Sequence, residues 1–137
     1  MDSYNDINEN DLIDAYFRNY EAIENGQYEN ENSWARETIE DIVFKEPLRG
    51  LELTLKLLRL CKNDKALAYV AAGPLENLFV YHGKHIIDRI TKEADKDVRI
   101  QLALSGVWLK ENNKIYPEWK NLMKRYKFLG KKPRKAL

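Results

Sequence analysis

The segment Pro47–Cys61, PLRGLELTLKLLRLC, decides the fold because it is apolar on two sides of one helix. Its leucines form two stripes that lie about 160° apart when each residue turns the helix by about 100°. One stripe holds Leu48, Leu51, Leu55 and Leu58, and the other holds Leu53, Leu57 and Leu60. A helix that is apolar on two sides is packed between neighbours, and Pro47 suits a first helical position, where its missing N–H is harmless. The segment therefore predicts a central, sandwiched helix.

Apolar residues recur at helical spacing along the rest of the chain, and no segment alternates as a strand would. Residues 10–24, for example, carry one apolar stripe, and the helix is expected to end near Gly26. The sequence predicts an all-α protein with about seven to eight helices, arranged as an irregular antiparallel bundle or a short stack of helical hairpins. Residues 1–129 are expected to form one domain and residues 130–137 a flexible basic tail.

Composition favours a soluble cytoplasmic protein. The chain has 137 residues, of which 44% are hydrophobic and 33% charged. Its acidic start lacks the basic head and apolar run of a signal peptide, and no window approaches the roughly 18 apolar residues of a membrane span. The single cysteine, Cys61, cannot form an internal disulfide, which suits a reducing compartment. We expect no membrane partner.

The stretch 68–83, AYVAAGPLENLFVYHG, contains a Gly-Pro pair that is expected to break a helix. If Gly73 caps the next helix, Pro74 is its first residue and Glu76 its third, from which a glutamate can reach back to the cap. The alternative is that Glu76 and nearby N–H groups form a binding or catalytic pocket. Gly83 is expected to end this helix, with His82 in its last turn. His82 and His85 have no further ligands nearby in sequence, so no metal site is expected.

This stretch and the residues after it resemble a bacterial family of small helical proteins of unknown function. The resemblance rests on Gly-Pro-Leu-Glu at residues 73–76, His-Gly at residues 82–83, and the ending VRIQLALSGVW at residues 98–108. It extends over residues 34–108. Because the family has no established activity, the resemblance implies a helical fold and no particular function.

Charge is distributed unevenly. Residues 1–32 hold nine acids and one base, whereas residues 120–137 hold eight bases and no acid. Such an asymmetry can steer a charged partner. The sequence lacks phosphate-loop, dinucleotide and zinc motifs, so no cofactor is expected.

Three functions follow from these patterns. The leading hypothesis is a non-enzymatic protein-binding module, such as an immunity protein that neutralises a basic toxin. Its expected partner-binding residues are Asp11, Asp14, Glu21, Glu24, Glu76 and His82. The first alternative is a nucleic-acid-associated protein that uses Lys131, Lys132, Arg134 and Lys135. The second alternative is an enzyme with a site near Glu76 and His82, although no motif places a nucleophile there.

Overall fold

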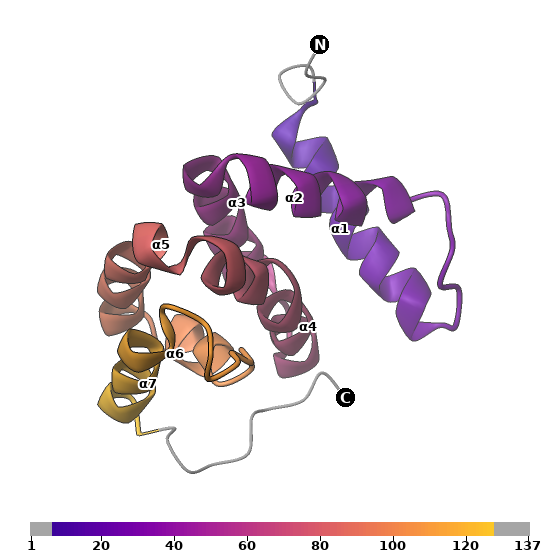
Figure 1. Ribbon diagram of the computed structural model, residues 1–137. Helices are drawn as coiled ribbons and strands as arrows, with labels where there is room; N and C mark the ends of the chain where they lie inside the picture. The colour runs from indigo at the N-terminus through magenta and orange to yellow at the C-terminus, as the bar shows by residue number, and fades with distance from the viewer. Residues whose placement is uncertain (1–6, 128–137) are drawn as a thin grey trace.

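The computed structural model describes residues 7–127 and shows helices without strands in this range (Figure 1). The all-α prediction is therefore confirmed for the described residues. The elements are α1 (Glu9–Glu24), α2 (Ser33–Lys45), α3 (Pro47–Leu60), α4 (Asp64–Val70), the π-helical turn η2 (Ala71–Leu75), α5 (Glu76–Lys96), α6 (Val98–Leu104) and α7 (Tyr116–Arg125). Within the same range, no helix is long and apolar enough to cross a lipid bilayer.

The expected number of helices is too high. Because α4, η2 and α5 follow one another without an intervening loop, the described chain has six separate helical segments instead of seven or eight. The excess comes from the two glycines that were expected to end helices, Gly73 and Gly83. Both lie inside the continuous stretch.

Helix α3 is the centre of the fold, as its two stripes predict. It contacts α2, α4, α5 and α6, and it passes through the middle of the view in Figure 1. Its buried apolar residues are Leu51, Leu53, Leu55, Leu57 and Leu58. Leu48 and Leu60 were expected to face inward, but both are exposed; they lie in the first and last turns of the helix.

A close approach between α2 and α3 depends on Gly50. A Cβ atom at this position would lie 2.8 Å from the Val43 Cα atom and 3.1 Å from its Cγ2 atom. The absence of a side chain allows the two helix backbones to come together, and both residues are buried. A larger residue at position 50 would have to push α2 away from the central helix.

The C-terminal end of α3 is held by a side chain from α6. The Arg99 guanidinium donates hydrogen bonds to the backbone carbonyls of Leu58, at 3.4 Å, and of Cys61. The last carbonyls of a helix have no partner inside the helix, and they carry partial negative charge. Arg99 therefore satisfies the end of the central helix and ties it to α6.

The Gly73–Pro74 pair forms a kink at which two helical stretches meet without an intervening loop. Gly73 has φ −102° and ψ −106°, which is not helical, and the π turn of η2 accommodates this departure. Residues on both sides have helical backbone angles, so the kink at Gly73 separates two helical stretches, as the predicted break at this pair requires. The Glu76 carboxylate, however, accepts its hydrogen bond from Trp108 N–H and not from the N–H of Gly73 that the cap interpretation requires.

Helix α5 is also kinked, close to the helix end that the sequence predicts at Gly83. The non-helical angles fall one residue earlier, at His82, with φ −138° and ψ 26°. A Cβ atom on Gly83 would lie 2.6 to 2.8 Å from the Cγ2, Cβ and Cγ1 atoms of Ile115. The glycine is thus needed for packing against the segment that precedes α7.

Candidate functional site

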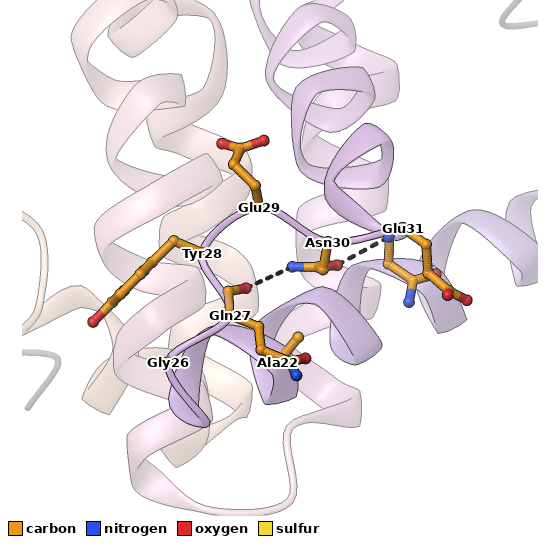
Figure 2. Close-up of a pocket in the computed structure, with 8 residues that line it drawn as sticks. Ala22, Gly26, Gln27, Tyr28, Glu29, Asn30 and Glu31 are labelled. Atoms are coloured by element: carbon orange, nitrogen blue, oxygen red, sulfur yellow. Dashed lines mark hydrogen bonds between the residues drawn. The ribbon is translucent and has the colours of Figure 1, made fainter.

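The loop between α1 and α2 lines an open concave depression, whose volume is about 690 Å³. Figure 2 shows its residues at close range. The surface is lined by Ala22, Gly26, Gln27, Tyr28, Glu29, Asn30, Glu31 and Asn32. All of these residues except Ala22, Asn30 and Asn32 are exposed, so the loop presents most of its side chains to solvent.

A defined helix ending turns the chain into this loop. Gln27 N–H donates to the Ala22 carbonyl at 2.8 Å, and Gly26 N–H donates to the Ile23 carbonyl at 2.9 Å. This pair of bonds is the Schellman motif, in which a residue with positive φ follows the last helical residues. Gly26 has φ 86°, a conformation that glycine adopts without strain. The prediction that α1 ends near Gly26 is confirmed.

Asn30 organises the rest of the loop. Its Nδ2 atom donates to the Gln27 carbonyl at 3.0 Å, and its Oδ1 atom accepts from Asn32 N–H at 2.9 Å, as the dashed lines in Figure 2 show. The same Nδ2 atom also donates to Oδ1 of Asn19, a fully buried residue of α1, at 2.9 Å. Asn30 N–H donates to Ser33 Oγ at 3.0 Å, at the start of α2. The loop is therefore anchored to both helices that it joins.

This anchoring leaves three large side chains free to contact another molecule. Tyr28 is 69% exposed, and Glu29 and Glu31 are also exposed. In Figure 2 the three side chains point away from the loop in different directions. Tyrosine supplies a large apolar contact with a polar tip and is enriched in binding hot spots. Tyr28 therefore offers a large apolar contact next to the two exposed carboxylates of Glu29 and Glu31.

The four predicted acidic residues of α1 are all exposed, but they do not gather in one place. Glu21 and Glu24 lie in the last turn, next to the loop. Asp11 and Asp14 lie about 10 to 20 Å along the axis from them, at 1.5 Å per residue. Two of the carboxylates are paired: Asp14 lies 3.0 Å from Arg18 Nε, and Glu24 pairs with Lys65 and raises the pKa of that ammonium group. We call Glu21, Glu24, Tyr28, Glu29 and Glu31 the acidic corner.

Glu76 and His82 each bind the backbone of a different segment. Glu76 Oε1 accepts a hydrogen bond from Trp108 N–H at 2.7 Å. Burial raises the pKa of Glu76, and the hydrogen bond from Trp108 acts in the opposite direction. His82 Nε2 lies 2.8 Å from the Phe44 carbonyl at the end of α2. Both side chains thus make structural contacts between segments.

The His82 region shows aromatic groups but no cluster of metal ligands. The rings of His82 and His85 lie 6.5 Å apart between centroids. Among the described residues, no three His, Cys, Asp or Glu side chains are close enough to hold a metal ion. Beside them, the exposed rings of Phe44 and Tyr81 meet edge to face at 5.1 Å. The predicted nucleic-acid residues Lys131, Lys132, Arg134 and Lys135 lie outside the described residues.

The sequence did not single out Glu29, Glu31 or Tyr28 as site residues. The segment reads as a polar loop, and polar loops are common. The available signal was an aromatic residue between acids in an asparagine-rich segment. The role of Asn19, the buried partner of Asn30, could not be predicted. Its position on α1 does not indicate which polar group it contacts.

A family model described as a family of unknown function (DUF6869) matches residues 22–125 of the chain. The chain belongs to this family, which confirms the resemblance to a family of unknown function and extends it beyond residues 34–108. No curated protein matches the chain, and no solved structure matches it. The matched range includes the whole α1–α2 loop and excludes most of α1.

Proposed function

We propose that the protein is a non-enzymatic, cytoplasmic protein-binding module that uses the acidic corner to bind a basic protein. In its most specific form, the proposal is that the partner is a toxin that this protein neutralises. The observation that carries the proposal is the anchored α1–α2 loop, which presents Tyr28 with Glu29 and Glu31 at a concave surface.

An anchored loop favours binding because less conformational freedom is lost when a partner docks. Ordering a flexible side chain or loop opposes association, and preorganisation reduces this cost. Here Asn30 fixes the loop backbone through Gln27, Asn32 and the buried Asn19. The exposed tyrosine can then act as an anchor without an additional folding step.

The charges supply the expected specificity. Complementary charge accelerates encounter and suppresses wrong partners more than it raises affinity. Glu21, Glu29 and Glu31 make no ion pair within the described residues, so their charges are available to a partner. Toxins that attack nucleic acids carry basic surfaces to bind phosphates, which is the kind of surface that this corner would attract.

The proposal can be tested with a charge-matched pair of variants. In the first variant Tyr28→Ala is combined with Glu29→Lys and Glu31→Lys. In the control, Glu37→Lys and Glu111→Lys change the net charge equally at exposed positions outside the acidic corner. Each protein is used to capture partners from the source cells, with quantitative mass spectrometry as the readout. We expect a basic protein to be retained by the native chain and the control and lost with the first variant.

Further outcomes distinguish toxin neutralisation from protein binding in general. If the captured protein stops growth when it is expressed alone, and growth returns on co-expression with the native chain, the toxin assignment is supported. Equal capture by both variants would contradict the use of the acidic corner. Capture of RNA or DNA alone would contradict protein binding and favour the basic tail.

A further inference from the structure

A second cavity lies at the Gly73–Pro74 kink, on the side of the molecule where α1, α2 and α4 meet. Its volume is about 200 Å³. It is lined by Tyr16, Arg36, Ile39, Glu40, Tyr69, Ala72, Gly73 and Pro74. None of these residues belongs to the acidic corner, so the cavity is a separate feature from the proposed protein-binding surface.

The first unusual group in this cavity is the hydroxyl of Tyr16. The residue is only 2% exposed, and its ring packs against that of Tyr69 with 5.8 Å between centroids. Its hydroxyl makes no hydrogen bond to any of the residues 7–127. A Cβ atom on Gly73 would lie 3.7 Å from the hydroxyl oxygen, so the glycine leaves space beside it. The oxygen is not fully enclosed, so the hydroxyl is open to the cavity and can donate a hydrogen bond to a ligand there.

The second unusual group is the guanidinium of Arg36. Its Nε atom is buried and has no hydrogen-bond partner. No carboxylate of the described residues lies within ion-pair distance of it, although Glu40 is one turn further along α2 and also lines the cavity. Burial raises the pKa of Tyr16 well above its usual value, and the same cause raises that of Tyr69. Both phenols therefore remain protonated donors at neutral pH beside this cation.

We propose that this cavity binds a small monocarboxylate through Arg36 and the Tyr16 hydroxyl. A guanidinium matches the two oxygens of a carboxylate, and a phenol can donate a third hydrogen bond. Ile39, Ala72 and Pro74 provide apolar walls for a short carbon chain. The cavity is smaller than the roughly 300 to 1,000 Å³ of sites for drug-sized ligands, which limits the occupant to a few carbon atoms. Glu40, an exposed carboxylate in the lining, repels any anion, and it repels a dianion such as phosphate more strongly than a monocarboxylate.

The carboxylate could be a free metabolite or the end of a peptide chain, and two probes separate these sources. The full chain is labelled with ¹⁵N-arginine and titrated with acetate or with N-acetyl-alanine, which mimics a peptide C-terminus. The readout is the Nε–H resonance of Arg36 in a two-dimensional NMR spectrum. Acetamide, which has a similar shape without charge, and sodium chloride at equal ionic strength are the control additions.

We expect a saturable shift of the Arg36 resonance with at least one carboxylate and none with the controls. Tyr16→Phe removes the hydroxyl and keeps the volume of the side chain. Because the lost hydrogen bond is to a charged group, binding should weaken by about tenfold or more. Arg18→Lys is the matched control. Arg18 lies on α1, the helix that carries Tyr16, but it is exposed and pairs with Asp14. This control should leave the dissociation constant unchanged.

Saturation by acetate assigns a free carboxylate, and saturation by N-acetyl-alanine alone assigns a peptide end. The absence of a saturable shift with both probes would overturn the proposal. An equal response to acetamide, or unchanged affinity in folded Tyr16→Phe protein, would also overturn it. Because the readout is a local resonance and Tyr16→Phe removes one oxygen atom, the test does not depend on a disruptive variant. It is also independent of whether the acidic corner binds a protein.

Discussion

Replacing Gly83 by alanine tests whether this glycine is a close-packing position or a helix end. In an open helix interior, alanine is more favourable than glycine by about 1 kcal/mol. Here the new Cβ atom would lie under 3 Å from the Cβ, Cγ1 and Cγ2 atoms of Ile115. Overpacking of this kind costs about 1 to 3 kcal/mol. Because the clash includes the Ile115 Cβ atom, we take the upper value, which leaves a net loss of about 2 kcal/mol.

The segment around Ile115 has little freedom to move away. Ile115 is buried, its N–H donates to Asn113 Oδ1 at 3.0 Å, and its carbonyl accepts from Trp119 N–H at 2.9 Å. These bonds hold both sides of the residue. The clash must therefore be relieved by displacement of helix α5 or of the segment that precedes α7.

The measurement is urea unfolding followed by circular dichroism. With a slope of about 2 kcal/mol per molar urea, Gly83→Ala should lower the midpoint by about 1 M. Ile115→Ala alone should cost about 2 to 5 kcal/mol through lost packing. Ile115→Ala also removes two of the three atoms that would clash with the new Cβ atom. The double variant should therefore lose at least about 1 kcal/mol less stability than the sum of the losses of the two single variants. A neutral or stabilising Gly83→Ala change, or strict additivity, would refute the reasoning.

Three further changes test the core, the Glu76 contact and the buried thiol. Leu55→Asp should abolish the cooperative thermal transition measured by circular dichroism, because Leu55 is fully buried in α3 and an unpaired charge there costs several kcal/mol. Glu76→Gln should lower the free energy of unfolding in urea by about 1 kcal/mol or less, since glutamine can still accept the hydrogen bond from Trp108 N–H. Burial raises the pKa of Cys61 from 9.0 to about 11, so the unfolded thiol ionises first as pH rises. Between these pH values the free energy of unfolding of the native chain should therefore fall with rising pH. Its slope should be steeper than that of Cys61→Ala by about 1.4 kcal/mol per pH unit, which unfolding curves at each pH would show.

The central helix could be predicted because burial on both sides constrains its composition directly. Leu53 and Leu57 on one stripe, and Leu51 and Leu55 on the other, could be assigned from spacing alone, and all four are buried. Leu48 has the same spacing but is 68% exposed. The position of a helix end relative to its neighbours is a tertiary property, so local periodicity could not reveal this exception.

Gly83 shows a different limit of local sequence patterns. A glycine at a helix end and a glycine that allows close packing give the same signal in a short segment. The partner of Gly83, Ile115, is 32 residues away in the chain, and no nearby residue indicates it. Similarly, the Glu76 carboxylate could be placed near a helix start, but its actual partner, Trp108, follows α6.

The candidate site could be predicted only in outline. The acidic character of the N-terminal region and a polar loop after Gly26 were evident from the sequence. The loop conformation depends on Asn19 and Asn30, which are 11 residues apart and on different elements. A polar residue on a helix is usually exposed, so the burial of Asn19 required knowledge of how α1 and α2 pack.

The burial of Asn19 and Tyr16 bears on how this family should be cut into fragments for expression. Sequence similarity begins at residue 22, yet α1 contributes core residues from Leu12 onward and supplies the buried amide that holds the loop. A fragment trimmed to residues 22–125 would lack these groups and expose the apolar surfaces of α2 and α4 that they cover. The cooperative folding unit is therefore longer than the stretch over which the family is recognised, and a fragment must begin before α1.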